Sequence, residues 1–210
     1  MQKKIMVLLG LLLILVSSLS CGRETETKEY KPVIYLYPEE TQRLSVRLDY
    51  KGELTHIYPS FSENNVWNVT AHPDGTLEGE DGKSYYALFW EGQKPGGYKI
   101  DRGFCVRGKD TASFLEDKLA KLGLNDREIN EFIIYWLPQM ENNPFNIIQF
   151  QDQAYTQDAN LTVLPKEDTM IRVFMTWYAS KTPIQIAEQE LITPVREGFT
   201  VVEWGGAKVK

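Results

Sequence analysis

One stretch in the middle of the chain most restricts the fold, because its periodicity differs from that of its surroundings. Between residues 111 and 140, apolar residues recur at intervals of three and four, as on one face of an α-helix. Leu115, Leu119 and Leu122 form the first apolar stripe, and Gly123 is a suitable residue to end that helix. The sequence therefore predicts a first helix that ends near Gly123.

A second helix is predicted directly after the first. Asn125 followed by Glu128 is the signature of a capping box, which satisfies backbone N–H groups at a helix start. Phe132 and Trp136 lie on one apolar face of this helix. We expect Pro138 to kink or end it, because proline lacks the N–H that a helix interior needs.

Strand-like runs stand on both sides of the helical stretch. Residues 44–50 alternate between apolar and polar side chains, and residues 85–92 are apolar on both faces, as in a central strand. After the helices, residues 170–178 and 198–206 are β-like again. The order strands, helices, strands predicts an α+β fold with antiparallel β-sheet meanders and a helical hairpin packed on the sheet.

The first twenty residues have the composition of a secretory signal peptide. Lys3 and Lys4 precede a continuous apolar run that is followed by small residues and then Cys21. A small residue directly before a cysteine resembles the lipobox of bacterial lipoproteins, although Ser18 stands where lipoboxes favour leucine. The resemblance implies that the sulfur of Cys21 is lipidated and that the leader is cut before it. The alternative is an ordinary secretory leader that leaves Cys21 as a free or disulfide-bonded thiol.

The chain divides by composition into four parts. We predict a signal peptide over 1–20, a flexible tether over 21–31, a β-rich subdomain over 32–107 and an α+β subdomain over 108–210. A single globular unit over 32–210 is the alternative.

Charge and cysteine content narrow the expected partners. The formal net charge is −6, and an acidic chain repels nucleic-acid phosphates and anionic lipid headgroups. The chain has two cysteines, Cys21 and Cys105, and no cluster of cysteine and histidine. We therefore expect no nucleic-acid partner, no metal and no cofactor.

Two motifs resemble parts of catalytic sites, but neither is complete enough to predict catalysis. Gly82-Lys83-Ser84 lacks the earlier glycine of a phosphate-binding loop and follows two acids. The run around Cys105 faintly resembles the cysteine motif of L,D-transpeptidases, but it lacks that family's preceding histidine. Without a nearby base a thiol reacts slowly, so Cys105 is interpreted as a small apolar core residue.

Two carboxylates form the better catalytic hypothesis. Glu91 and Glu203 each continue an apolar strand face and each stand next to a tryptophan. Acids in such surroundings have raised pKa values, and two of them could hydrolyse a glycoside if they faced one cleft. The competing interpretation is that each pairs with an arginine, such as Arg47 or Arg172, or lies in water at a strand end.

Aromatic and amide residues are the candidates for ligand binding. Trp90 and Trp204 offer flat rings, and Asn142 and Asn143 offer amides that hydrogen-bond hydroxyl groups. The same asparagines also fit a turn before Pro144.

Three motifs carry a family resemblance: KPVIYLYP (31–38), FIIYWLPQMENN (132–143) and VVEWGG (201–206). In this order they resemble a family of uncharacterised exported bacterial proteins, and the resemblance spans most of the mature chain. It implies a signal peptide and one globular unit, and it implies no activity.

The sequence favours a lipid-anchored, extracytoplasmic protein of the cell envelope with a non-catalytic binding role. The expected partner is an envelope polymer, a sugar or another protein, and the lipid supplies membrane attachment. The alternative is a glycan-directed envelope hydrolase that uses Glu91 and Glu203.

Overall fold

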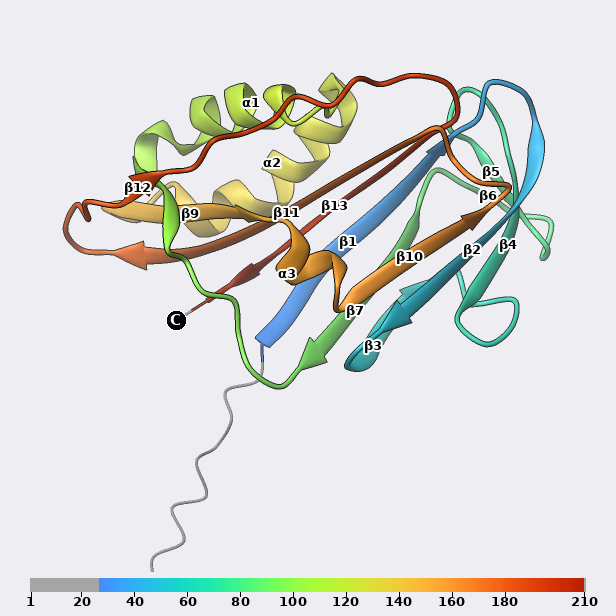
Figure 1. Cartoon of the computed structure of the whole chain (residues 1–210), viewed down its shortest axis with the longest axis horizontal. Coiled ribbons are helices and arrows are strands. Elements are labelled where there is room, and N and C mark those ends of the chain that lie inside the picture. The colour runs from blue at the N-terminus through green and yellow to red at the C-terminus, as the bar shows by residue number, and fades with distance from the viewer. Residues whose placement is uncertain (1–26, 210) are drawn as a thin grey trace, which may run out of the picture.

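The computed structural model describes residues 27–209, which fold into an α+β structure rich in β-strand (Figure 1). The α+β class predicted from the sequence is confirmed in this coarse sense. Two sheets, with mostly antiparallel pairing, contain the thirteen strands of this part of the chain.

The larger sheet has eight strands in the order β12-β8-β9-β11-β13-β1-β7-β3. Strands β11 and β13 pair in parallel, as do β12 and β8, and the other neighbours are antiparallel. The strands are β1 (Thr27–Tyr37), β3 (Glu53–Tyr58), β7 (Leu88–Lys94), β8 (Arg102–Arg107), β9 (Phe145–Gln151), β11 (Thr169–Ser180), β12 (Ala187–Glu188) and β13 (Thr200–Lys208).

The smaller sheet has five strands in the order β10-β2-β4-β5-β6, all antiparallel. Its strands are β2 (Gln42–Tyr50), β4 (Val66–Ala71), β5 (Leu77–Gly79), β6 (Ser84–Tyr85) and β10 (Ala159–Leu164). A simple meander does not describe the chain path, because β3 follows β2 in sequence but joins the other sheet.

Two apolar cores lie on opposite faces of the eight-stranded sheet. Val33 and Tyr35 of β1 belong to one core, whereas the alternating residues Ile34 and Leu36 belong to the other. Side chains of successive strand residues point to opposite faces, so a strand in both cores is covered on both sides. The first core contains the helices, and the second contains the five-stranded sheet, which gives three layers (Figure 1).

Two helices supply the outer layer of the first core: α1 (Thr111–Lys121) and α2 (Asp126–Met140). The predicted capping box is present, because Asn125 and Glu128 exchange side-chain-to-backbone hydrogen bonds. Pro138 lies inside the last turn of α2, and the helix continues to Met140. The arrangement of the two helices as a hairpin on the sheet stays a prediction.

The close approach of α2 to the sheet depends on a glycine. A Cβ at Gly206 of β13 would lie 2.8 Å from Cζ2 of Trp136 and 2.5 Å from the carbonyl oxygen of Met175. Trp136 itself has no exposed surface. The helix can therefore rest this bulky ring on the strand only where the strand has no side chain.

Two short elements complete the fold: the 3₁₀-helix η1 (Gly108–Asp110) and α3 (Gln153–Thr156). A long connection between β12 and β13 crosses the helical layer (Figure 1). Within it, Arg196 forms two hydrogen bonds, of 3.1 and 3.2 Å, to the fully buried carboxylate of Glu128.

The start of the described chain overlaps the predicted tether. Residues 27–31 are already part of β1, and Thr27 and Glu29 are buried. The predicted signal peptide, Cys21 and the rest of the tether lie outside the described residues. The eight-stranded sheet takes strands from both sides of residue 107. The two predicted domain arrangements stay predictions.

Glu29 stands in a buried polar cluster where β1 enters the fold. The hydroxyl of Tyr98 donates to one of its carboxyl oxygens, and the ammonium of Lys94 lies 3.9 Å away and pairs with Asp158. Burial raises the pKa of Glu29 from 4.5 to about 7, and Tyr98 and Lys94 offset only part of this effect.

This cluster predicts a pH-dependent stability. A carboxyl whose pKa is higher in the folded than in the unfolded state stabilises the fold while protonated, and that contribution is lost as the pH rises from about 4.5 through about 7. The loss amounts to at most roughly 3 kcal/mol. Glu29→Gln, which cannot ionise, should be less sensitive to pH and more stable than wild type at pH 8, as measured by urea denaturation.

The exposed substitution Glu40→Gln is the control, and it should follow the wild-type curve. If wild type and Glu29→Gln keep the same difference in unfolding free energy from pH 4 to pH 8, Glu29 does not titrate as described.

Candidate functional site

A hollow with accessible aromatic rings lies beside α2, on the helical face of the eight-stranded sheet. It has a volume of about 600 Å³ and is open to solvent. We call it the tyrosine pocket, and it is lined by Lys31, Val33, Tyr58, Ser84, Tyr85, Tyr86, Ala87, Phe89, Glu91 and Tyr135. Its volume falls within the range of small-molecule sites.

The position of this pocket follows from incomplete coverage of the sheet. Strand β1 contributes Val33 and strand β7 contributes Phe89, which face each other in the ladder. On the other side, α2 contributes Tyr135 to the lining. The pocket therefore forms where α2 stops covering the sheet and the strands β7 and β3 continue.

Accessible aromatic rings dominate the walls. Tyr58 is 61% exposed and Tyr86 is 51% exposed, so both rings are accessible from solvent. Tyr58 and Tyr85 meet edge to face, with ring centroids 5.5 Å apart. The guanidinium of Arg127 lies 5.0 Å from the Tyr86 ring centroid, which helps hold that ring in place.

Tyr135 is held neutral on the wall of the pocket. Its pKa is raised to about 12, first by burial and then by the nearby negative charge of Glu91. Its hydroxyl therefore keeps its proton at physiological pH and can donate a hydrogen bond.

Glu91 is the acid of this pocket, and its carboxylate is engaged on both sides. One oxygen accepts the backbone N–H of Lys31 at 3.2 Å, and the other lies 3.3 Å from Nδ1 of His56. Lys31 has a φ of 56°, a left-handed backbone that non-glycine residues rarely adopt, at an irregularity in the pairing of β1 with β7. This backbone turn aims the N–H of Lys31 at Glu91.

The same turn directs the Lys31 side chain across the pocket. Its ammonium lies 5.3 Å from the centroid of the Tyr135 ring, a cation–π distance. The pocket thus combines aromatic faces with one cation and one anion, both fixed by the fold.

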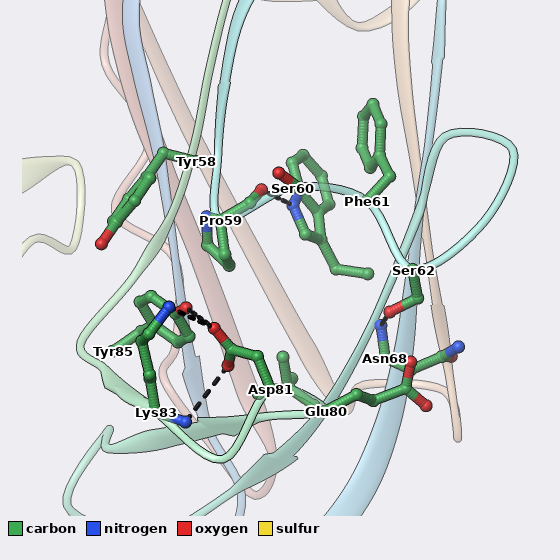
Figure 2. A pocket seen from close by; sticks show the side chains of 13 residues that line it. Tyr58, Pro59, Ser60, Phe61, Ser62, Asn68, Glu80, Asp81, Lys83 and Tyr85 are labelled. Carbon is green, nitrogen blue, oxygen red and sulfur yellow. Dashed lines mark hydrogen bonds and ion pairs between the residues drawn. The ribbon is translucent and has the colours of Figure 1, made fainter.

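A second hollow of about 370 Å³ adjoins the first (Figure 2). Tyr58 and Tyr85 line both hollows. In the second, the hydroxyl of Tyr85 donates to Asp81 at 2.7 Å and the Lys83 ammonium lies 3.0 Å from the same carboxylate (Figure 2). Its polar groups are already paired with one another, so they attract a ligand less than those of the tyrosine pocket.

Asp81 illustrates that pairing. Its pKa is lowered to about 2, mainly by the hydrogen bonds from Tyr85 and Lys83. It is therefore an anion that is fully engaged across the physiological range.

The structure does not bring the predicted carboxylate pair together. Glu203 faces the core of the five-stranded sheet, with no exposed surface, next to Ile34 in the ladder. Glu91 lines the tyrosine pocket on the opposite, helical side of the sheet. One cleft cannot present both carboxylates to a glycoside.

Glu203 instead forms a buried ion pair of the kind that the competing interpretation described. Arg172 donates from Nε at 2.6 Å, and the indole N–H of Trp90 donates to the other oxygen at 3.1 Å. The two charged residues are cross-strand neighbours on β11 and β13. This arrangement satisfies the carboxylate inside the core.

Three of the four residues that the sequence suggested for ligand binding are buried or hydrogen-bonded within the fold. Trp90 and Trp204 have no exposed surface, so neither ring offers a face to a ligand. The Asn143 amide donates to the Gln139 carbonyl at 3.1 Å and to the Asn146 side chain at 2.8 Å, which fixes the turn after α2. Asn142, in the same turn, is exposed and does not line the tyrosine pocket.

The cysteine and the two histidines of the described residues each contact other groups of the fold. The sulfur of Cys105 accepts the backbone N–H of Ile184 at 3.4 Å. His56 lies beside Glu91 and His72 lies beside Thr41 and Glu78, so each histidine has other partners. Within residues 27–209 no three residues of metal-ligating type are grouped, and no helix is both long and apolar enough to cross a membrane.

The tyrosines that line the pocket are not among the site residues predicted from the sequence. The sequence predicts one apolar strand over 85–92, but Tyr85 ends β6 of the smaller sheet, Tyr86 follows it, and β7 begins only at Leu88. Tyr135 is adjacent to the core residue Trp136, and helical spacing separates their directions by about 100°. The available signal was the abundance of tyrosine. The chain has 11 tyrosines, and the apolar stripes of the predicted helices and strands include only a few of them.

The site and the fold together define the chain as an α+β protein with an open pocket lined by aromatic side chains. No protein-family model matches it, and no solved structure matches it. It is 40% identical over 96 residues to an uncharacterized protein in bglA 3'region of Butyrivibrio fibrisolvens. The match covers 99% of that protein and 44% of this chain. The chain belongs to the same family as this uncharacterised protein.

The buried ion pair gives a testable prediction about Glu203. Arg172→Met leaves the buried carboxylate without its counter-charge, which should lower the free energy of unfolding by about 3–5 kcal/mol. The double substitution Arg172→Met/Glu203→Leu should recover much of that loss, because it removes the unpaired charge. Urea denaturation of the two single variants and the double variant measures the coupling.

Arg43→Met is the matched control, since Arg43 pairs with Glu80 at 2.6 Å on the surface. Its cost should stay below about 1 kcal/mol. Additive losses in the double variant would contradict a structural role for the Arg172–Glu203 pair.

Proposed function

We propose that this protein is a lipid-anchored, extracytoplasmic protein that binds a glycan of the cell envelope in the tyrosine pocket, without catalysis. One observation carries the proposal: five aromatic side chains surround an open hollow of about 600 Å³ that also contains a fixed cation and anion.

Glycan chemistry suits this combination. Pyranose rings with equatorial hydroxyls present C–H groups on their flat faces and hydroxyls at their edges. The rings of Tyr58, Tyr86 and Tyr135 can cover the faces, as aromatic side chains do in many binding sites. Lys31 and Glu91 can hydrogen-bond the edges, the first as a donor and the second as an acceptor.

The charges in the pocket support binding rather than hydrolysis. Among the pocket-lining residues of the described chain, Glu91 is the one carboxylate, and glycoside hydrolysis ordinarily needs two. Its oxygens are engaged by His56 and by the backbone of Lys31. The hydrolase alternative loses the partner that it required, since Glu203 lies on the other side of the sheet.

The location part of the proposal rests on the leader. The positive start, the apolar run and the small residues before Cys21 support export and lipid attachment. The three-motif resemblance supports the same family of exported proteins. Two of its motifs contribute to the tyrosine pocket, through Lys31 and Val33 of the first and Tyr135 of the second.

Aromatic truncation tests the binding site. Tyr86→Ala and Tyr135→Ala should each weaken the binding of cellohexaose or chitohexaose at least about tenfold, or about 1.4 kcal/mol, because each removes a stacking face. Isothermal titration calorimetry measures the affinities, with urea denaturation to verify that the variants stay folded.

Ile134→Ala is the matched control, because Ile134 is 73% exposed on the same helix and does not line the pocket. It should bind like wild type. The proposal would be contradicted if neither hexasaccharide bound to wild type. It would also be contradicted if Ile134→Ala weakened binding as much as the two tyrosine variants.

Lipid attachment has a separate test. Wild-type protein expressed in a bacterial host with a fatty-acid probe should be labelled, and Cys21→Ala should not, because that sulfur is the proposed acceptor. Cys105→Ala is the control and should be labelled like wild type. Equal labelling of wild type and Cys21→Ala would contradict lipidation at this residue.

A further inference from the structure

A third hollow continues the tyrosine pocket past Tyr135. It has a volume of about 420 Å³ and is lined by Lys28, Tyr30, Tyr135, Gln139 and Lys208. Tyr135 lines both hollows, so its ring forms the boundary between them. We call this third hollow the lysine pocket.

The three hollows therefore form a series with shared walls. Tyr58 and Tyr85 connect the hollow of Figure 2 to the tyrosine pocket, and Tyr135 connects the tyrosine pocket to the lysine pocket. A compact ligand would fill one of them, whereas an extended chain can contact all three. The tyrosines at the boundaries offer rings to successive units of such a chain.

The charges along the series are not evenly distributed. The lysine pocket is lined by two cations and no acid, and both Lys28 and Lys208 are exposed. Lys31, at the Tyr135 boundary, adds a third ammonium. Among residues 27–209 the ion pairs of this chain do not include Lys28, Lys31 or Lys208.

The shape of the lysine pocket also determines what it can hold. The ammonium of Lys208 lies 5.1 Å from the Trp177 ring centroid, which restricts its position on the wall. Lys28 and Tyr30 are alternate residues of β1, so their side chains lie on the same side of the strand. The cations are thus arranged around a concave site. Binding to a flat anionic surface would instead call for cations on a protruding surface.

We infer that the bound glycan is a chain of uronic-acid units whose carboxylates lie in the lysine pocket while neighbouring sugar rings stack in the tyrosine pocket. The inference rests on the proposed function and adds the class of sugar. A carboxylate can hydrogen-bond the ammonium groups of Lys28 and Lys208, and a neutral sugar cannot offset their charge.

A matched pair of ligands tests the inference. A hexamer of β-1,4-linked glucuronate and cellohexaose have the same linkage and differ in the carboxylates. Titration calorimetry on the full mature chain at low salt should give at least about tenfold tighter binding of the glucuronate hexamer, and the advantage should shrink in 0.5 M salt because charges are screened.

The lysines are tested by Lys28→Gln/Lys208→Gln. This double variant should lose the preference for glucuronate and keep the affinity for cellohexaose. Lys99→Gln/Lys109→Gln removes the same charge from exposed positions outside the three hollows and should retain the preference.

Other outcomes would overturn either the inference alone or the inference together with the proposed function. Equal binding of the two hexamers by wild type overturns the inference and leaves the proposed function standing, and binding of neither overturns both. Vesicles containing phosphatidylglycerol serve as a third probe. If Lys28→Gln/Lys208→Gln weakens vesicle binding but not glucuronate binding, the lysines contact a membrane, and the inference is wrong.

Discussion

Strand β1 is the constraint on which the rest of the structure depends. It is hydrogen-bonded on one side to β13, near the end of the chain, and on the other to β7. Its residues alternate between the helical core and the core of the five-stranded sheet. A strand that is paired on both edges and buried on both faces depends on the parts that cover it for its stability. The N-terminal and C-terminal halves of the chain therefore stabilise one another, and the buried pair of Arg172 and Glu203 lies in the ladder next to this strand.

The candidate site follows from the edges of that arrangement. Helix α2 packs closely on β13 because Gly206 leaves room for Trp136. It does not extend over β7 and β3, and the uncovered part of the sheet is bordered by tyrosines, which tolerate both apolar and aqueous surroundings. The irregular turn at Lys31 places a backbone donor against Glu91 and a cation against Tyr135. A pocket at an incompletely covered sheet face is thus fixed by the same packing that forms the core.

Much of the fold could be predicted because it depends on local patterns. The helix start at Asn125 and Glu128 follows from a hydrogen-bonding exchange within one turn, and the structure contains it. The alternation in residues 44–50 follows from the two-residue repeat of a strand, and Leu44, Val46 and Leu48 are buried as expected. The hypothesis about Glu91 and Glu203 depended on which face each strand presents to which neighbour. Those faces are set by the long-range register, in which Ile34 stands opposite Glu203 and Val33 stands opposite Phe89.

The sequence by itself determined the class of fold, the positions of most strands and both helices, and the expectation of export through its leader. Only the tertiary structure decided that Trp90 and Trp204 are core residues, that Glu29 is buried at the entry of β1, and that the accessible rings are Tyr58, Tyr86 and Tyr135. The physical reason is that helix and strand periodicity acts over a few residues and shows which side chains share a face. What covers that face depends on segments far apart in the chain, such as β1 and β13, which meet only in the folded protein.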